Sequence, residues 1–280
     1  MRLSDGVSLR VAESGAAAAP PILLVHGWGA STYMWRAWFA PLVAAGFRAI
    51  AVDLPGHGMS DKPTDSGRYT VDRMVDSVRE LIEIERLDRP HIVGQSMGGT
   101  IVLELALREL VPLGRLVLVN PAAFGHLRMV PLARRASPRA VEAVLERIVP
   151  RWIIARAHRL AYGDPSRVTD ADIDQYWAPS QFPGHASAMR RLVHEFTWRR
   201  VEPHEMAERL AALRPPTSPV LVVLGTRDRL VRDARPYVAR LIAAGAPLEL
   251  HESALGGHAV NEERPEDIVP VVLDFVRRRG

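Results

Sequence analysis

Residues 94–99 read Gly-Gln-Ser-Met-Gly-Gly and stand between an apolar run at 91–95 and a helical pattern at 97–110. The pattern Gly-x-Ser-x-Gly between a strand and a helix is typical of a sharp turn that lifts the serine Oγ off the edge of a sheet. Glycines two residues before and two residues after Ser96 leave room for the close backbone approach that such a turn needs. The sequence therefore predicts a strand–turn–helix unit that places Ser96 at the positive end of a helix dipole.

Apolar runs similar to the one at 91–95 recur along the chain and alternate with amphipathic stretches. Runs rich in Leu, Val and Ile suit strands of a parallel sheet that is covered on both faces. Their alternation with helices predicts an α/β fold with a mostly parallel, doubly wound sheet, for which we expect about eight strands. Strands are predicted at 7–12, 22–26, 48–52, 91–95, 115–119, 220–224 and 247–251, and helices at 34–45, 71–87, 97–110, 234–244 and 265–279.

One interval, residues 122–212, interrupts this alternation, because it contains helical patterns and loops but no strong strand. Thr169 with Asp172 resembles a capping box at the start of one of these helices. Since the helical block lies between two predicted core strands, we interpret it as an inserted cap, and we assign the core to 1–121 and 213–280. Cap helices are predicted at 138–148, 151–162, 169–177 and 186–197.

The composition is that of a globular chain and excludes several classes of protein. The chain has 280 residues, of which 48% are hydrophobic and 24% charged, so we expect a sizeable core rather than disorder. The formal net charge is only +4 and acidic residues are interspersed with basic ones, so no nucleic-acid partner is expected. Cysteine is absent, which excludes disulfides, thiolate metal sites and a cysteine nucleophile.

The sequence also bears on location and on partners. No stretch approaches the ~20 apolar residues that cross a bilayer. The segment at 1–10 lacks the apolar region of a secretory signal. We therefore expect a cytoplasmic protein without stable membrane insertion. The histidines of the interval 122–212 are scattered rather than spaced as metal ligands, so no metal and no cofactor are expected. The oligomeric state stays open.

Two further motifs accompany the one at 94–99: His-Gly-Trp-Gly at 26–29 and Asp-Leu-Pro-Gly-His-Gly at 53–58. Together the three motifs resemble those of the α/β-hydrolase superfamily, and the resemblance covers nearly the whole chain outside the cap. The chain is similar to small capped members: esterases, enol-lactone hydrolases, cofactor-free haloperoxidase-like perhydrolases and carbon–carbon bond hydrolases. The resemblance implies an α/β-hydrolase fold and a hydrolase with Ser96 as its nucleophile.

The resemblance also implies the acid and the base of a catalytic triad. In the family the acid follows the next-to-last core strand, and the histidine lies in a loop after the last strand. Asp228 and His258 occupy these two places. His258 would take the proton from Ser96, and Asp228 would orient the imidazole. Asn120 follows another core strand, where some relatives place an acid, but an amide cannot serve as one.

The backbone N–H groups of Trp28 and Met97 are implied as the oxyanion hole, which needs only main-chain donors. The side chain of Trp28 would put an apolar face near the acyl pocket, with core packing as the alternative. Apolar packing is an equally good interpretation of the other pocket candidates. These candidates are Met97, Met129 and Leu132. Trp152 is a further candidate, for which a place in the core or on the surface of a helical cap is the favoured interpretation.

Structural roles are expected for several other residues. His26 is expected to fix the geometry of its loop, and Asp53 and His57 to make side-chain-to-backbone hydrogen bonds in their Gly/Pro turn. Pro270 falls inside the last helical pattern, at 265–279, so we expect a kink or a later helix start there.

These residues together predict hydrolysis of a carboxylic ester, lactone or thioester through an acyl-enzyme on Ser96. The substrate is expected to be small and partly hydrophobic, with its identity set by the cap, where the motifs do not reach. Hydrolysis of the carbon–carbon bond of a vinylogous diketone ranks second, because such enzymes usually have a longer Gly/Pro-rich loop than the one at 27–30. Cofactor-free perhydrolysis would use the same triad.

Two other possibilities are less favoured by the residues. Dehalogenases and epoxide hydrolases of this fold use aspartate at the position that Ser96 occupies. A ligand-binding receptor or scaffold with little turnover is the alternative from a different class, since a fold alone does not determine function. The presence of Ser, Asp and His at all three places argues against it.

Overall fold

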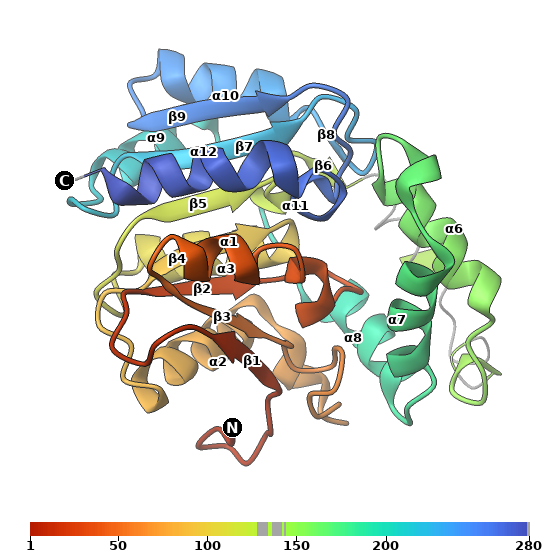
Figure 1. Ribbon diagram of the computed structural model, residues 1–280. Helices are drawn as coiled ribbons and strands as arrows, with labels where there is room; N and C mark the ends of the chain where they lie inside the picture. The colour runs from red at the N-terminus through yellow and green to blue at the C-terminus, as the bar shows by residue number, and fades with distance from the viewer. Residues whose placement is uncertain (128–133, 136–141, 143, 279–280) are drawn as a thin grey trace.

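A seven-stranded sheet with the order β1-β3-β2-β4-β5-β7-β9 forms the centre of the protein (Figure 1). The computed structural model describes residues 1–127, 134–135, 142 and 144–278. All neighbouring strands run parallel except β1, which pairs antiparallel with β3, so the predicted mostly parallel α/β sheet is confirmed. The strands are β1 (Val11–Ser14), β2 (Pro21–Val25), β3 (Arg48–Val52), β4 (His91–Gln95), β5 (Leu116–Val119), β7 (Val220–Gly225) and β9 (Leu248–Ser253).

The sheet has seven strands in the described part of the chain, which is consistent with the expected number of about eight, and the short strands β6 (His126–Leu127) and β8 (Val231–Arg232) pair separately from it. One detail of the predicted sheet was wrong. The first strand begins at Val11 and not at residue 7. The preceding segment folds back on itself instead, because Gly6, at a φ of +88°, closes a tight turn there.

Both faces of the central strands are buried, which explains why these strands read as unbroken apolar runs. Successive side chains point to opposite faces: in β2, Leu23 and Val25 join one hydrophobic cluster, and Ile22 and Leu24 join the other. The first cluster is covered by α2 (Val71–Ile84), α3 (Met97–Leu107), α9 (Pro203–Ala211) and α10 (Ala234–Ala243), and the second by α1 (Phe39–Ala44) and α12 (Pro265–Arg277).

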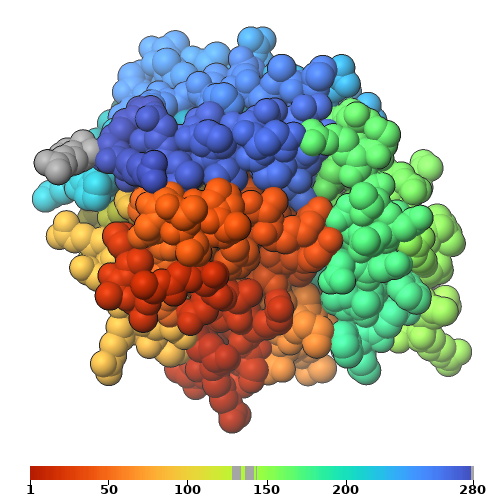
Figure 2. Space-filling view, viewed as in Figure 1, coloured from red at the N-terminus to blue at the C-terminus, as the bar shows by residue number. Residues whose placement is uncertain are grey.

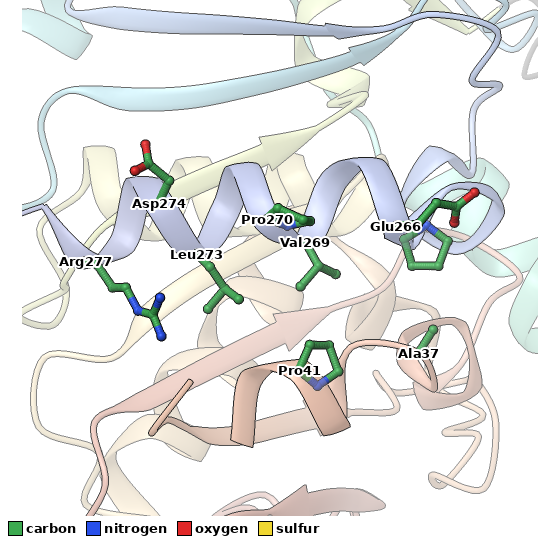
Figure 3. Close-up of a pocket in the computed structure, with 9 residues that line it drawn as sticks. Ala37, Pro41, Glu266, Val269, Pro270, Leu273, Asp274 and Arg277 are labelled. Atoms are coloured by element: carbon green, nitrogen blue, oxygen red, sulfur yellow. The ribbon is translucent and has the colours of Figure 1, made fainter. Parts of the chain in front are cut away.

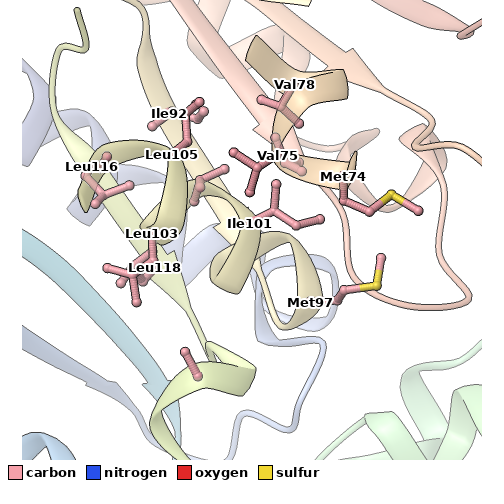
Figure 4. Packing of buried hydrophobic residues seen from close by; sticks show 14 of the residues in the cluster. Met74, Val75, Val78, Ile92, Met97, Ile101, Leu103, Leu105, Leu116 and Leu118 are labelled. Carbon is pink, nitrogen blue, oxygen red and sulfur yellow. The ribbon is translucent and has the colours of Figure 1, made fainter. Parts of the chain in front are cut away.

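Helix α3, which follows Ser96, is packed between α2 and the sheet (Figure 4). Its Ile101 points toward Val75 of α2, and its Leu103 toward Leu118 of β5. Each fully buried side chain of this size stabilises the fold by about 1.5–3 kcal/mol. This packing holds the start of α3, and with it Ser96, in a fixed place.

The helices α6 (Arg151–Ala161), α7 (Asp170–Ser180) and α8 (His185–Glu195), which we propose form the cap, lie together beyond the carboxyl ends of the strands, against one side of the core (Figures 1 and 2). Helix α7 begins with the predicted capping box, in which Thr169 and Asp172 exchange hydrogen bonds. Part of the predicted helix at 138–148, residues 138–141 and 143, lies outside the described residues.

Helix α9 packs against α10 of the core, although the boundary at residue 212 assigns it to the insertion (Figure 1). Its buried side chains Met206, Ala207 and Leu210 belong to the same hydrophobic cluster as the sheet. We therefore propose that the insertion ends before Pro203.

Helix α12 runs without interruption from Pro265 to Arg277, so the later helix start that was expected at Pro270 is wrong. Pro270 lies on the exposed side of the helix, and the buried side, with Val269 and Val272, keeps its contacts. A groove of about 510 Å³ passes between α12 and α1, with Pro41 and Leu273 among its lining residues (Figure 3). In the part of the chain that the structure describes, no helix is both long and apolar enough to cross a membrane.

His91 at the start of β4 makes the stability of the fold depend on pH. Its Nδ1 accepts the backbone N–H of Arg115 at 2.9 Å, so the imidazole is neutral in this state. Burial, and then the positive charge of Arg115, lower the pKa of His91 to about 4. The unfolded chain, in which a histidine has a pKa near 6.5, therefore binds more protons between these two values, and the folded state loses stability as the pH falls.

We predict that the free energy of unfolding falls by about 1–2 kcal/mol more in the wild type than in His91→Gln when the pH is lowered from 7 to 5. Glutamine keeps an acceptor for the backbone N–H but does not titrate. Urea denaturation at the two pH values measures the difference. Equal pH dependence in both proteins would contradict the assignment.

Candidate active site

Ser96 lies at the turn between β4 and α3 with a φ of +52° and a ψ of −111°. Such a backbone conformation is uncommon for a residue with a side chain and is found where the surrounding structure imposes it. Here the two glycines that flank the serine make room. An added Cβ at Gly98 would lie 2.3 Å from the carbonyl oxygen of Val25, and one at Gly94 would lie 2.5 Å from Val102. The predicted reason for both glycines is therefore correct.

The structure brings Ser96, His258 and Asp228 together in one line of hydrogen bonds. The hydroxyl of Ser96 lies 2.8 Å from Nε2 of His258, and Nδ1 of His258 lies 2.8 Å from Oδ2 of Asp228. Because Asp228 accepts the proton on Nδ1, Nε2 is the unprotonated nitrogen and accepts from the serine. The side chains of His258 and Asp228 are both buried.

Asp228 is fixed by backbone donors on its other oxygen. Oδ1 accepts the N–H groups of Leu230 at 2.7 Å and Val231 at 3.0 Å in the turn after β7. This leaves Oδ2 free to face His258. Because both oxygens of Asp228 have partners, the carboxylate is held in one orientation, unlike that of an aspartate exposed on the surface.

Two amide side chains hold the loop of His258, and sequence reasoning did not assign them this role. Gln95 Nε2 and Asn120 Nδ2 donate to the carbonyl oxygen of His258 at 3.0 and 2.9 Å. Asn120 Nδ2 also donates to Gly257, while its Oδ1 accepts the N–H of Gly225 at 2.9 Å. Asn120, at the end of β5, therefore ties the strand that leads to Asp228 to the loop that carries His258.

Replacement of Asn120 by aspartate is predicted to lower the free energy of unfolding by about 3 kcal/mol or more, and activity with it. The carboxylate would face two carbonyl oxygens and lose both donors, although it has nearly the same shape. Urea denaturation and a hydrolase assay on the folded fraction measure the two effects. Unchanged stability would show that the amide is not needed at this position.

His26 and Asp53 hold the loop beside Ser96 in place, as expected. His26 Nδ1 donates to the carbonyl of Gly27 at 2.7 Å, and its Nε2 accepts the N–H of Leu54 at 3.0 Å. Burial lowers the pKa of His26, which keeps it neutral and suited to this pair of bonds. Asp53 accepts backbone N–H groups from Thr32 and Met59.

The pocket candidates have different positions. Met97 is 5% exposed and belongs to the core cluster, whereas Trp28 is 50% exposed. Trp152 is 67% exposed on α6, and the buried face of this helix carries Ala155, so the place of Trp152 in a substrate pocket stays a prediction. Met129 and Leu132, the remaining candidates, lie outside the described residues.

A polar network with two buried carboxylates joins the proposed cap to the core close to the loop of His258. Arg36 of the core pairs with Asp172 of α7 at 2.6 Å and with Glu262 of α11 (Val260–Glu263). Tyr33 donates to Asp172 at 2.9 Å, and Tyr176 of α7 donates to Glu262 at 2.8 Å. The carboxylates of Asp172 and Glu262 therefore share the guanidinium of Arg36, and these contacts hold α7 against the core. Among the described residues, no group of three or more His, Asp or Glu side chains is placed to hold a metal ion.

Comparison with known proteins agrees with the fold. A family model described as the alpha/beta hydrolase fold matches residues 20–265. The protein is a hydrolase of this fold class. The chain belongs to the α/β-hydrolase fold family.

Relatives of this chain differ in the substrates that their names state. A haloalkane dehalogenase from Mycobacterium marinum is 30% identical, over 94% of this chain and 86% of its own length. A putative carbamate hydrolase from Rhizobium rhizogenes is 30% identical, over 94% of each chain. The crystal structure of a putative aryl esterase from Burkholderia cenocepacia has a TM-score of 0.79 at 25% identity, covering 99% of this chain and 96% of its own.

Proposed function

We propose that this hydrolase cleaves carboxylic esters of small, partly hydrophobic substrates through an acyl-enzyme on Ser96. The observation that carries the proposal is the position of His258 between Ser96 and Asp228, at 2.8 Å from each. This is the geometry in which a histidine accepts the serine proton while a carboxylate stabilises the imidazolium that forms.

The chemistry then proceeds in two steps. Ser96 Oγ attacks the ester carbonyl carbon while His258 takes its proton, and the tetrahedral intermediate expels the alcohol, which receives that proton from His258. Water next attacks the acyl group on Ser96, with His258 again as the general base. The acid leaves and the serine regains its proton, so the enzyme returns to its starting state.

The oxyanion of the tetrahedral intermediate would be bound by the backbone N–H groups of Trp28 and Met97. Met97 is the first residue of α3, where N–H groups lack partners within the helix and the helix dipole favours negative charge. The loop before Trp28 passes directly beside the nucleophile: an added Cβ at Gly27 would lie 3.0 Å from the Cβ of Ser96. Each such donor can contribute about 3 kcal/mol to the transition state.

Serine at the nucleophile position supports a carbonyl substrate over an alkyl halide, although one relative is named as a dehalogenase. Displacement of halide by a serine oxygen would form an ether, which water cannot cleave by the same route. Attack of Ser96 on a carbonyl forms an ester, which the water step removes. Esters, lactones, thioesters and carbamates all meet this requirement.

Hydrolysis of short p-nitrophenyl esters tests the proposal, with lactones and a vinylogous diketone assayed in parallel. We expect turnover of the esters that depends on Ser96. Turnover of the diketone alone would favour carbon–carbon bond cleavage instead. If none of these substrates were turned over and a fluorophosphonate did not modify Ser96, a ligand-binding protein would be favoured.

A further inference from the structure

The loop that carries His258 is in contact with the end of α6 as well as with the core. The backbone at Gly163, just after α6, lies so near this loop that an added Cβ there would be 2.1 Å from the carbonyl oxygen of Leu255. An added Cβ at Gly257 would be 2.2 Å from the backbone nitrogen of Gly163. The N–H of Ala259 donates to the carbonyl of Ala161 in α6 at 3.0 Å. The end of α6 and the His258 loop are therefore in direct backbone contact.

One carboxylate spans this contact. Glu263, at the end of α11, is 2% exposed, and three backbone N–H groups donate to it. Its Oε2 accepts from Gly257 at 2.7 Å and from Gly163 at 2.9 Å, and its Oε1 accepts from Asp164 at 2.8 Å. Only a carboxylate satisfies all three donors, because an amide would turn its own N–H groups toward at least one of them.

We propose that Glu263 is a positioning residue through which the cap holds His258 at hydrogen-bond distance from Ser96; the inference rests on the proposed function of the triad. The carbonyl of His258 is held from the core by Gln95 and Asn120, and the adjoining Gly257 is held by Glu263. The general base is thus fixed from two sides, and one of these sides is the cap.

Glu263→Gln tests the proposal, with Glu266→Gln as the matched control. Glu266 also joins the core to this part of the cap, through an ion pair with Arg167 at 2.7 Å, but this pair is exposed and does not include the His258 loop. The first readout is the rate at which a fluorophosphonate modifies Ser96 in the folded protein. The second is the pH profile of kcat for a p-nitrophenyl ester.

We expect Glu263→Gln to slow labelling and to lower kcat by about 10²-fold, because small misplacements of a reacting group have effects of this size. KM is expected to change much less, and the acid limb of the kcat profile to move. The control should stay within about 2-fold of the wild type, since exposed ion pairs contribute little. A merely structural role for Glu263 would lower thermal stability but leave the pH profile of the folded protein unchanged.

Gly163→Ala tests the contact between the end of α6 and the His258 loop without replacing Glu263. Its added Cβ must push the end of α6 away from the His258 loop, so labelling is again expected to slow. Wild-type labelling rates in either folded variant would overturn the positioning role and leave the proposed function standing. Failure of the wild type itself to be labelled would instead contradict the proposed function.

Discussion

Replacement of Ser96 by alanine is expected to lower kcat for short p-nitrophenyl esters by about 10⁵-fold or more, because members of a triad act as a unit. Without Oγ there is no atom to form the acyl-enzyme, although the oxyanion donors and the base remain. Initial-rate kinetics on purified wild type and variant measure the loss. Thermal stability should change little, since the buried packing of α3 is untouched.

A serine outside the site provides the control for this substitution. Ser66 is exposed and distant in sequence from Ser96, so Ser66→Ala should retain wild-type kinetics. Turnover by Ser96→Ala within about 10-fold of the wild type would contradict the role of Ser96 as nucleophile.

Replacement of Asp228 by asparagine is expected to lower kcat by about 10⁴-fold. The amide that replaces Oδ2 would donate to Nδ1 of His258 and so stabilise the wrong tautomer, with the proton on Nε2. The imidazole could then no longer accept the proton of Ser96. Steady-state kinetics measure the loss, and a circular dichroism spectrum shows whether the variant is folded.

Asp233 offers a matched control, because it follows Asp228 by five residues and also faces a histidine. Its contact with His126 is exposed and 3.3 Å long. Asp233→Asn should therefore keep activity within about 2-fold. If the two variants lost activity equally, the effect would lie in the turn and not in the triad.

Local sequence patterns predicted the parts of the fold that depend on neighbouring residues. The strand at 91–95, the turn at Ser96 and the helix after it were predicted from periodicity and from two glycines, and the structure has all three. The central strands were predictable for the same reason, since burial on both faces leaves unbroken apolar runs. The resemblance to a family then supplied Asp228 and His258, which no spacing would have found.

Contacts between distant segments were not predictable in this way. Asn120 and Glu263 act through backbone groups more than 100 and 90 residues away, respectively, so their roles have no local signature. Trp152 is exposed and the buried face of α6 carries Ala155, but which face of this helix is buried depends on how the helix packs against distant segments, which its own sequence does not show. Glu263 follows His258 by only five residues, but its contacts with Gly163 and Asp164 are visible only in the folded structure.

Mapping the covalent adduct of a fluorophosphonate by mass spectrometry tests directly whether Ser96 is the nucleophile. The reagent needs a serine activated by a base and does not depend on knowing the natural substrate. We predict a stoichiometric adduct on the peptide that carries Ser96, and none in Ser96→Ala. An unlabelled wild type, or an adduct on another residue that persists in Ser96→Ala, would contradict it.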